Sequence, residues 1–179
     1  VFSIDTETLD IEKVVVGTED SFKLRRLFKK DSLLYLLSAR NLYVSSNGGE
    51  SWTFEDRTGL PANLVDFVIF GNYKIVSSGD AIYIKHFQED RWNKAFSSNN
   101  PIRRFYAPDV LFVIIGDDIY FSTNGLRYSL LFKNDKNLEI NDIIKYKTFV
   151  VLATNKGLYK DDGTFYFAVD KVDVSLYDI

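Results

Sequence analysis

Hydrophobic residues recur along the chain in short runs of strand length, separated by polar turns. A hydrophobic-Tyr dipeptide marks this recurrence most clearly, at Leu42-Tyr43, Ile82-Tyr83, Ile119-Tyr120 and Leu158-Tyr159. The four tyrosines are 40, 37 and 39 residues apart. A nearly constant period of this length is typical of repeat proteins, in which each period is one structural unit.

Each repeat predicts four short strands. The hydrophobic-Tyr dipeptide opens a third strand, a polar turn and two β-rich runs precede it, and a hairpin and a fourth strand follow it. Trp52 and Trp92 stand on two of the fourth strands, nine residues past the tyrosine. The first-strand runs are 22–28, 64–70, 102–106 and 140–146, and the second-strand runs are 33–37, 73–76, 110–115 and 149–152. Four-stranded units repeated in this way indicate the blades of a β-propeller.

The two ends of the chain resemble halves of a further unit. Residues 1–15 predict a third and a fourth strand, and the alternation of Val172, Val174 and Leu176 over 171–179 predicts a first strand. We therefore expect an all-β fold in one domain, 1–179: a propeller of five blades closed by its terminal strands, or a segment of a larger propeller. The expected units are a half blade at 1–20, blades at 21–58, 59–98, 99–136 and 137–169, and a half blade at 170–179.

The amino-acid composition excludes several classes of functional site. The 179 residues include no Cys, no Met and one His, and the formal net charge is −3. These counts exclude disulfides, thiol catalysis and a metal centre built on several histidines. The negative net charge does not favour binding to nucleic acid. No hydrophobic run reaches the length needed to span a membrane. The lack of sulfur residues suits an oxidising or a hot environment. The sequence leaves the compartment open and favours an extracellular location or a particle surface. Because the sequence does not begin with Met, we expect a processed product or a piece of a longer polypeptide.

The segment Ser45-Ser46-Asn47-Gly48-Gly49-Glu50-Ser51-Trp52 resembles the Asp-box hairpin of sialidase-type (BNR) β-propellers, Ser-x-Asp-x-Gly-x-Thr-Trp. Asn47 takes the place of the Asp and Ser51 that of the Thr. The residues expected to build the hairpin are Ser45, Asn47, Gly49, Ser51 and Trp52. A weaker echo begins at Ser122-Thr123-Asn124-Gly125, where Leu126 and Ser129 replace the later Gly and Trp of the pattern.

The resemblance implies a scaffold without the family's chemistry. In that family the Asp-box is a structural hairpin at the periphery of a blade. Catalysis there uses an arginine triad, a Tyr nucleophile with a Glu partner and an Asp acid/base, and no positions of this chain match those motifs. We therefore expect no enzyme activity, no catalytic residues, no metal and no cofactor. His86 lacks an identifiable Ser or Asp partner and is expected to have a surface or capping role.

Polar residues of the first strands are the candidate ligand-binding residues. Alignment of the repeats brings together Arg25, Asp66, Arg103, Asn141 and Asp173. First strands line the central channel of a propeller, and arginine there holds a carboxylate or phosphate through two hydrogen bonds. The alternative interpretation is a ladder of Arg–Asp pairs that satisfy one another and fill the channel.

We accordingly expect a non-enzymatic scaffold that binds a protein partner within a surface, viral or secreted assembly. A carbohydrate-binding, lectin-like propeller is the alternative, because 11 Tyr and 2 Trp suit stacking on sugars. A glycoside hydrolase is the third class. The expected partner is thus a protein or a glycan, with no nucleic acid and no insertion into a membrane, and the sequence leaves the oligomeric state open.

Overall fold

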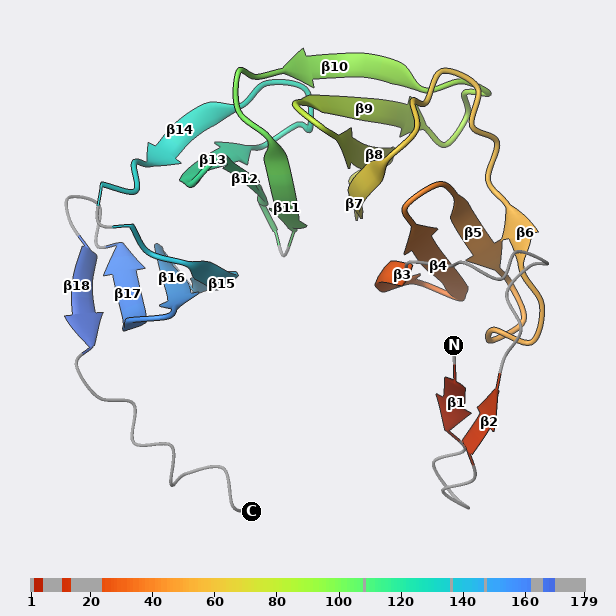
Figure 1. The fold of residues 1–179 in the computed structure, drawn as a ribbon, viewed down its shortest axis with the longest axis horizontal. Coiled ribbons are helices and arrows are strands. Elements are labelled where there is room, and N and C mark those ends of the chain that lie inside the picture. The colour runs from red at the N-terminus through yellow and green to blue at the C-terminus, as the bar shows by residue number, and fades with distance from the viewer. Residues whose placement is uncertain are drawn as a thin grey trace.

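The computed structural model describes residues 2–4, 11–13, 24–107, 109–135, 137–146, 148–161 and 166–169. Every regular element within these residues is a β-strand. The strands form four antiparallel sheets of four strands each and one two-stranded sheet. The four larger sheets stand in an arc with their first strands towards the centre (Figure 1). The prediction of an all-β propeller with four-stranded blades is confirmed.

Within each blade the strands follow one another from the centre of the arc outwards. The first blade is β3 (Leu24–Lys30), β4 (Leu33–Ser38), β5 (Leu42–Ser45) and β6 (Thr53–Phe54). The second is β7 (Leu64–Phe70), β8 (Tyr73–Ser78), β9 (Ala81–His86) and β10 (Asn93–Ser97). The third is β11 (Ile102–Tyr106), β12 (Leu111–Ile115), β13 (Asp118–Ser122) and β14 (Ser129–Phe132). The fourth is β15 (Ile140–Tyr146), β16 (Phe149–Thr154), β17 (Gly157–Asp161) and β18 (Tyr166–Val169).

The first residues of the chain also form strands. β1 (Phe2–Ile4) and β2 (Ile11–Lys13) pair with each other as an antiparallel two-stranded sheet. The strand expected over 171–179, which was to close a five-bladed ring, lies outside the described residues.

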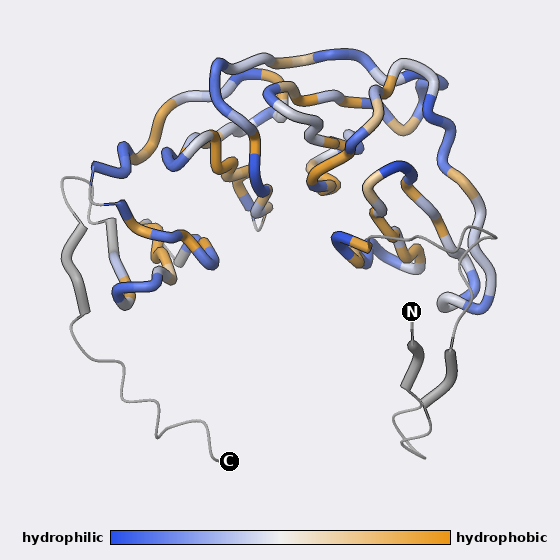
Figure 2. The backbone as a smooth tube through the Cα atoms, viewed as in Figure 1, coloured by the Kyte–Doolittle hydropathy of each residue, from blue (hydrophilic) through white to orange (hydrophobic). Residues whose placement is uncertain are grey.

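Hydrophobic contacts between the faces of successive blades hold the arc together. Figure 2 shows that hydrophobic residues gather on the inner strands, around β7, β8, β11 and β12. One buried cluster joins the first two blades, a second joins the second and third, and another joins the third and fourth. Representative members are Tyr35, Phe67 and Trp92, then Val68, Ile75 and Phe105, then Phe112, Ile143 and Leu152. Each such side chain contributes roughly 1.5–3 kcal/mol through its burial.

The connection between the first two blades is fixed by backbone contacts. The amide of Trp92 donates to the carbonyl of Thr58 at 2.8 Å, and the indole Nε1 donates to the carbonyl of Asp56 at 2.9 Å. Gly59 has a φ of 93° and lies against the carbonyl oxygen of Trp92, which leaves no room for a side chain. Glycine is required here for both reasons, and it lets the connection pass beneath the outer strands of the second blade.

Every inner strand of the four complete blades carries the same irregularity. The register between the first and second strands shifts at the second residue of the inner strand, which is the geometry of a β-bulge. The shifts lie between Leu24 and Arg26, Leu64 and Asp66, Ile102 and Arg104, and Ile140 and Asp142. Because a bulge changes which side chains face the neighbouring sheet, it decides which polar residue of each blade meets the next blade.

Candidate functional site

The Asp-box hairpin is held by its own side chains. Ser45 Oγ accepts the amide of Gly49 at 2.9 Å, and Asn47 Oδ1 accepts the amide of Ser51 at 3.0 Å. The side-chain amide of Asn47 donates to Ser51 Oγ at 3.0 Å, and the indole of Trp52 donates to the carbonyl of Gly49 at 2.9 Å. The five residues named from the sequence thus lie together. Their polar groups form hydrogen bonds within the turn, which indicates that the hairpin has a structural role.

The third blade repeats this hairpin with a different aromatic residue. Ser122 Oγ accepts the amide of Gly125 at 2.9 Å, and Asn124 Oδ1 accepts the amides of Leu126 and Arg127. Tyr128 Oη then donates to the carbonyl of Gly125 at 2.8 Å, as the indole of Trp52 does to Gly49 in the first blade. Tyr128 therefore takes the part of the tryptophan, in place of Ser129, to which sequence alignment had assigned that position.

Burial raises the pKa of the Tyr128 hydroxyl well above its ordinary value near 10. A group whose folded-state pKa is raised contributes stability that is complete below its unfolded pKa and is lost as the pH rises above that value. We expect the free energy of unfolding to fall between pH 9 and pH 11, and Tyr128→Phe to reduce that fall. The substitution should cost about 1 kcal/mol at pH 8 through the lost hydrogen bond. Urea unfolding across this pH range measures both effects. If the free energy of unfolding depends on pH in the same way in the wild type and in Tyr128→Phe, Tyr128 is not the group responsible.

The bulges align one charged residue from each blade on the inner strands. These are Arg26, Asp66, Arg104 and Asp142, so the sign of the charge alternates around the arc. Arg25, which the sequence suggested, is exposed, and Arg26 is the residue that faces the second blade. Asn141 is also exposed, although its carbonyl accepts the hydroxyl of Tyr106 at 2.8 Å. Asp173 lies outside the described residues.

Asp66 joins three blades in one clasp. Arg26 Nη1 donates to both oxygens of Asp66, at 2.9 and 2.7 Å, and to the carbonyl of Phe105 at 3.0 Å. Asp66 Oδ2 accepts the amide of Phe105 at 2.7 Å, and Oδ1 accepts the amide of Phe67 at 2.9 Å. The Asp66 side chain is only 7% exposed. The expected Arg–Asp pair therefore exists between the first and second blades, and the backbone of the third blade completes it.

A second buried group of charges lies between the first two blades. Glu55 accepts Lys74 Nζ at 2.7 Å and Lys85 Nζ at 3.0 Å, and all three side chains are at most 12% exposed. Lys74 also lies near the rings of Tyr35 and Phe87, at 5.9 and 5.5 Å from their centroids. Sequence reasoning did not find this group, because Glu55 follows a two-residue strand and its partners stand on two strands of the next blade.

The junction between the third and fourth blades differs from the first two. At the first two junctions the backbone amides of Leu64 and Ile102 donate to the carbonyls of Ala39 and Gly79 in the preceding blades, each within 2.9 Å. Between the third and fourth blades the corresponding place is a cavity of about 430 Å³. It is lined by Arg103, Arg104, Ile114, Asp117, Asn137, Leu138, Glu139 and Ile140. A volume of this size accommodates a short peptide segment or a small sugar.

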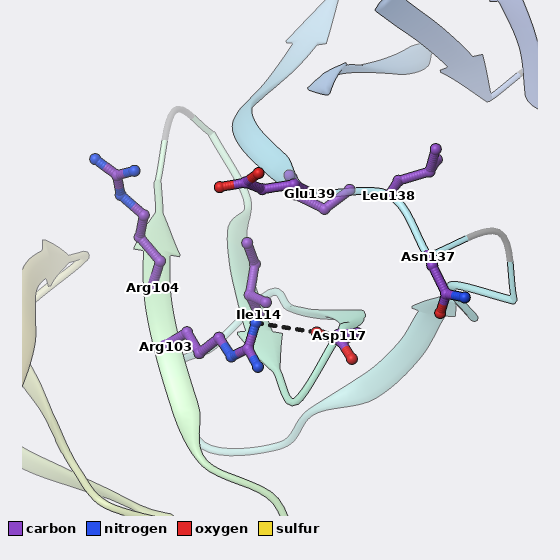
Figure 3. A pocket seen from close by; sticks show the side chains of 8 residues that line it. Arg103, Arg104, Ile114, Asp117, Asn137, Leu138 and Glu139 are labelled. Atoms are coloured by element: carbon purple, nitrogen blue, oxygen red, sulfur yellow. Dashed lines mark ion pairs between the residues drawn. The ribbon is translucent and has the colours of Figure 1, made fainter. Parts of the chain in front are cut away.

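The walls of the cavity carry charges of both signs. Arg103 pairs with Asp117 at 3.0 Å, and both side chains are more than half exposed, at 57% and 62%. Figure 3 shows Arg103 turned towards Asp117 and the carboxylate of Glu139 directed to the side of β11. The loop that carries Leu138 is fixed from behind, because the buried side-chain amide of Asn134 donates to its carbonyl and accepts its amide. The cavity thus has a rigid hydrophobic floor and an exposed charged rim.

His86, the single histidine of the chain, contacts residues of its own blade. His86 Nδ1 accepts the amide of Gln88 at 3.2 Å, and its ring packs edge-on against Tyr73. Over the part of the chain that the structure describes, no group of three or more His, Cys, Asp or Glu side chains is placed to hold a metal ion. In the same residues there is no helix of the length and hydrophobicity needed to span a membrane.

No protein-family model and no curated protein matches the sequence. Solved structures match the fold. YCF48 from Cyanidioschyzon merolae is 15% identical with a TM-score of 0.65, over 92% of this chain and 65% of that one. A structure of YCF48 bound to D1 peptide is 16% identical, with a TM-score of 0.64 over 90% of this chain and 58% of that one. PorZ, a surface component of the type-IX secretion system of Porphyromonas gingivalis, is 20% identical, with a TM-score of 0.67 over 96% of this chain.

The chain spans less than two thirds of each of these proteins, and only 24% of PorZ. Its partial length relative to them fits the expectation of a segment of a larger propeller. At identities of 20% or less, the similarities concern the path of the backbone and establish the fold alone. The chain is a β-propeller of four-stranded blades.

Proposed function

We propose that this protein is a non-enzymatic interaction scaffold, and that it binds a polypeptide segment of a partner at the cavity between its third and fourth blades. The observation that carries the proposal is the contrast between its two kinds of charged residue. Asp66, Glu55 and Lys85 are nearly buried and form ion pairs that join blades of the fold, whereas Arg103 and Asp117 are more than half exposed. The exposed pair can exchange its partner for a ligand at little cost.

The chemistry of the rim favours a polar peptide over a uniformly charged ligand. Arg103 and Arg104 offer donors for a carboxylate, while Asp117 and Glu139 offer acceptors for an ammonium or guanidinium group. Complementary charges at a rim direct the approach and the orientation of a protein partner. Two structural neighbours are consistent with this use of the fold, because one is a surface component of a secretion system and another is bound to a peptide.

The experiment that tests the proposal is site-specific photo-cross-linking in native material. A photoreactive amino acid at Asn137 lies on the cavity, and the same residue at Asp90 lies on an exposed loop of the second blade. We expect a defined partner band from position 137 that is absent from position 90. Equal products from the two positions, or none from either, would contradict a binding role for the cavity.

Replacement of the rim charge should weaken this capture. We expect Arg103→Ala to reduce the yield of the partner cross-linked at position 137 by about tenfold, because a charge-assisted hydrogen bond is worth roughly 1.5–3 kcal/mol. Arg91→Ala removes an exposed arginine of the second blade and serves as the matched control. Mass spectrometry of the captured band measures the yield. Unchanged capture by the Arg103 variant would remove this side chain from the site.

Carbohydrate binding is the second candidate, because the cavity is also of the size of a small sugar and combines polar rim groups with a hydrophobic floor. A glycan array separates the two functions: binding of one glycan class that Arg103→Ala abolishes would favour the lectin. The two carboxylates at the rim, Asp117 and Glu139, make a glycosidase assay worthwhile. Turnover of a fluorogenic glycoside, sialosides included, would overturn the non-enzymatic assignment.

A further inference from the structure

The first amide of β15 points away from its own sheet. Asn155 donates its amide to the carbonyl of Glu139 at 3.1 Å, directly beside the cross-strand pair Ile140–Thr154. In an antiparallel ladder, pairs that exchange hydrogen bonds alternate with pairs that do not, so Ile140 does not donate to Thr154. Its amide is directed out of the fourth blade instead, towards a group that another element has to supply.

The preceding blades show what an amide at this place binds. Leu64 and Ile102 stand at the same place on β7 and β11, and their amides donate to turn carbonyls of the preceding blade, those of Ala39 and Gly79. Each of these turns joins the second and third strands of its blade. Among the residues that the structure describes, no acceptor is found for the amide of Ile140. This junction therefore keeps one backbone donor that the first two junctions use.

The equivalent turn of the third blade is engaged elsewhere. It consists of Gly116 and Asp117, between β12 and β13. Asp117 pairs with Arg103 of its own blade at 3.0 Å (Figure 3). Gly116 lies so close to Asn100 that an added Cβ would be 3.2 Å from the Cβ of that residue. The cavity lined by Asp117 and Ile140 separates this turn from β15. The segment that makes the contact at the first two junctions is thus described here, and it does not make it.

We propose that a tight turn of the partner protein occupies this cavity, and that a backbone carbonyl of the turn accepts the amide of Ile140. The chain itself supplies such a carbonyl at both earlier junctions, so the partner completes a contact that the fold already makes twice. A cavity of about 430 Å³ holds the few residues of a turn. A turn held in a hairpin is also preorganised, which reduces the entropy lost on binding. The inference rests on the proposed scaffold function and specifies the conformation of the bound segment.

The probe for this site is a cyclic peptide copied from the second blade. It carries Val-Ser-Ser-Gly-Asp-Ala-Ile-Tyr, residues 76–83, which contain the Gly79 turn and parts of both flanking strands, closed into a ring by D-Pro-Pro. NMR of the isotope-labelled 179-residue chain follows its binding. In the free chain we expect the amide of Ile140 to exchange its hydrogen faster than that of Ile102. As the peptide is added, the Ile140 amide signal should shift and its exchange should slow.

Replacing one amide by an ester locates the contact. The hydroxy-acid analogue of isoleucine at position 140 replaces N–H by O and keeps the side chain, so the cyclic peptide should bind about fivefold more weakly, the effect of one hydrogen bond. The same replacement at position 102 is the matched control, because each ester also weakens a preceding carbonyl that accepts an amide. It should leave peptide binding unchanged but lower the urea midpoint below that of the position-140 ester, since the Ile102 amide donates to Gly79.

Equal affinity of the cyclic peptide for the unmodified chain and the position-140 ester, or no binding of the peptide, would overturn the proposal. So would equal urea midpoints of the two esters, which would show that the Ile140 amide already has an acceptor in the folded chain. A native partner that cross-links at position 137 equally well in the position-140 ester would leave the scaffold function standing and remove this contact. If the unmodified chain captures no partner either, the scaffold function itself fails.

Discussion

Replacing Asp66 with alanine is expected to lower the free energy of unfolding by about 3 kcal/mol, because it removes the carboxylate that a partly buried guanidinium and the buried amide of Phe105 share. Arg26 and the amide of Phe105 both depend on this carboxylate, and its side chain is 7% exposed. For a chain of this length, such a loss corresponds to a fall in Tm of roughly 10 °C. Urea and thermal unfolding of the purified variant measure it.

Arg25→Ala is the matched control for the clasp, because Arg25 stands beside Arg26 on the same strand and is exposed. It should change stability by no more than about 0.5 kcal/mol. The double variant Arg26→Ala/Asp66→Ala should be more stable than the sum of the single losses predicts, since it removes both charges together. Additive losses would show that the two residues act separately and would contradict the clasp.

Glu55→Ala is expected to destabilise the fold by a similar amount, about 3–5 kcal/mol, because it leaves two lysine ammonium groups buried between the first two blades. The Lys74 and Lys85 side chains are only 12% and 8% exposed, so both ammonium groups are largely shielded from water. Denaturant unfolding provides the measurement. The exposed Glu50 of the Asp-box hairpin gives the control substitution, Glu50→Ala, with an expected change of less than about 0.5 kcal/mol.

A triple variant separates burial of charge from loss of packing. Replacing Glu55, Lys74 and Lys85 together with methionine removes every charge of the group while keeping most of the volume. Such exchanges are often neutral or stabilising. We expect the triple variant to recover most of the stability that Glu55→Ala loses. If it is as unstable as the single variant, the cost arises from packing in the junction and the charge argument is wrong.

The repeat of hydrophobic-Tyr dipeptides was sufficient to predict the blades, because strand pattern is a local property. The tyrosines at 43, 83, 120 and 159 all lie on third strands. The choice between adjacent arginines was not predictable in the same way. Alignment of the repeats put Arg25 and Arg26 at the same place, whereas the structure shows that Arg26 shares the inward face with Phe28, next to the bulge between Leu24 and Arg26. Adjacent polar residues at this place in three of the four complete repeats, Arg25-Arg26, Arg103-Arg104 and Asn141-Asp142, were the available sign of this irregularity.

Contacts between blades were harder to foresee. The Glu55 group joins residues 19 and 30 positions apart, on elements whose relative placement depends on how two sheets pack. Tyr128 in place of a tryptophan was missed because the third hairpin is one residue shorter between its Ser and its aromatic residue. Hydrogen bonding from the aromatic ring to the turn carbonyl, rather than the residue type, is what the two hairpins share.

The four-stranded unit repeats in every blade, but the charge on the inner strand repeats only in every second blade. Arg26 and Arg104 stand on the first and third blades, and Asp66 and Asp142 on the second and fourth. Loss of the second blade would therefore bring Arg26 beside Arg104, and loss of the third would bring Asp66, whose carboxylate is buried, beside Asp142. The smallest piece that can be copied or deleted without that conflict is a pair of blades, so a lineage that changes ring size while keeping this clasp should do so two blades at a time.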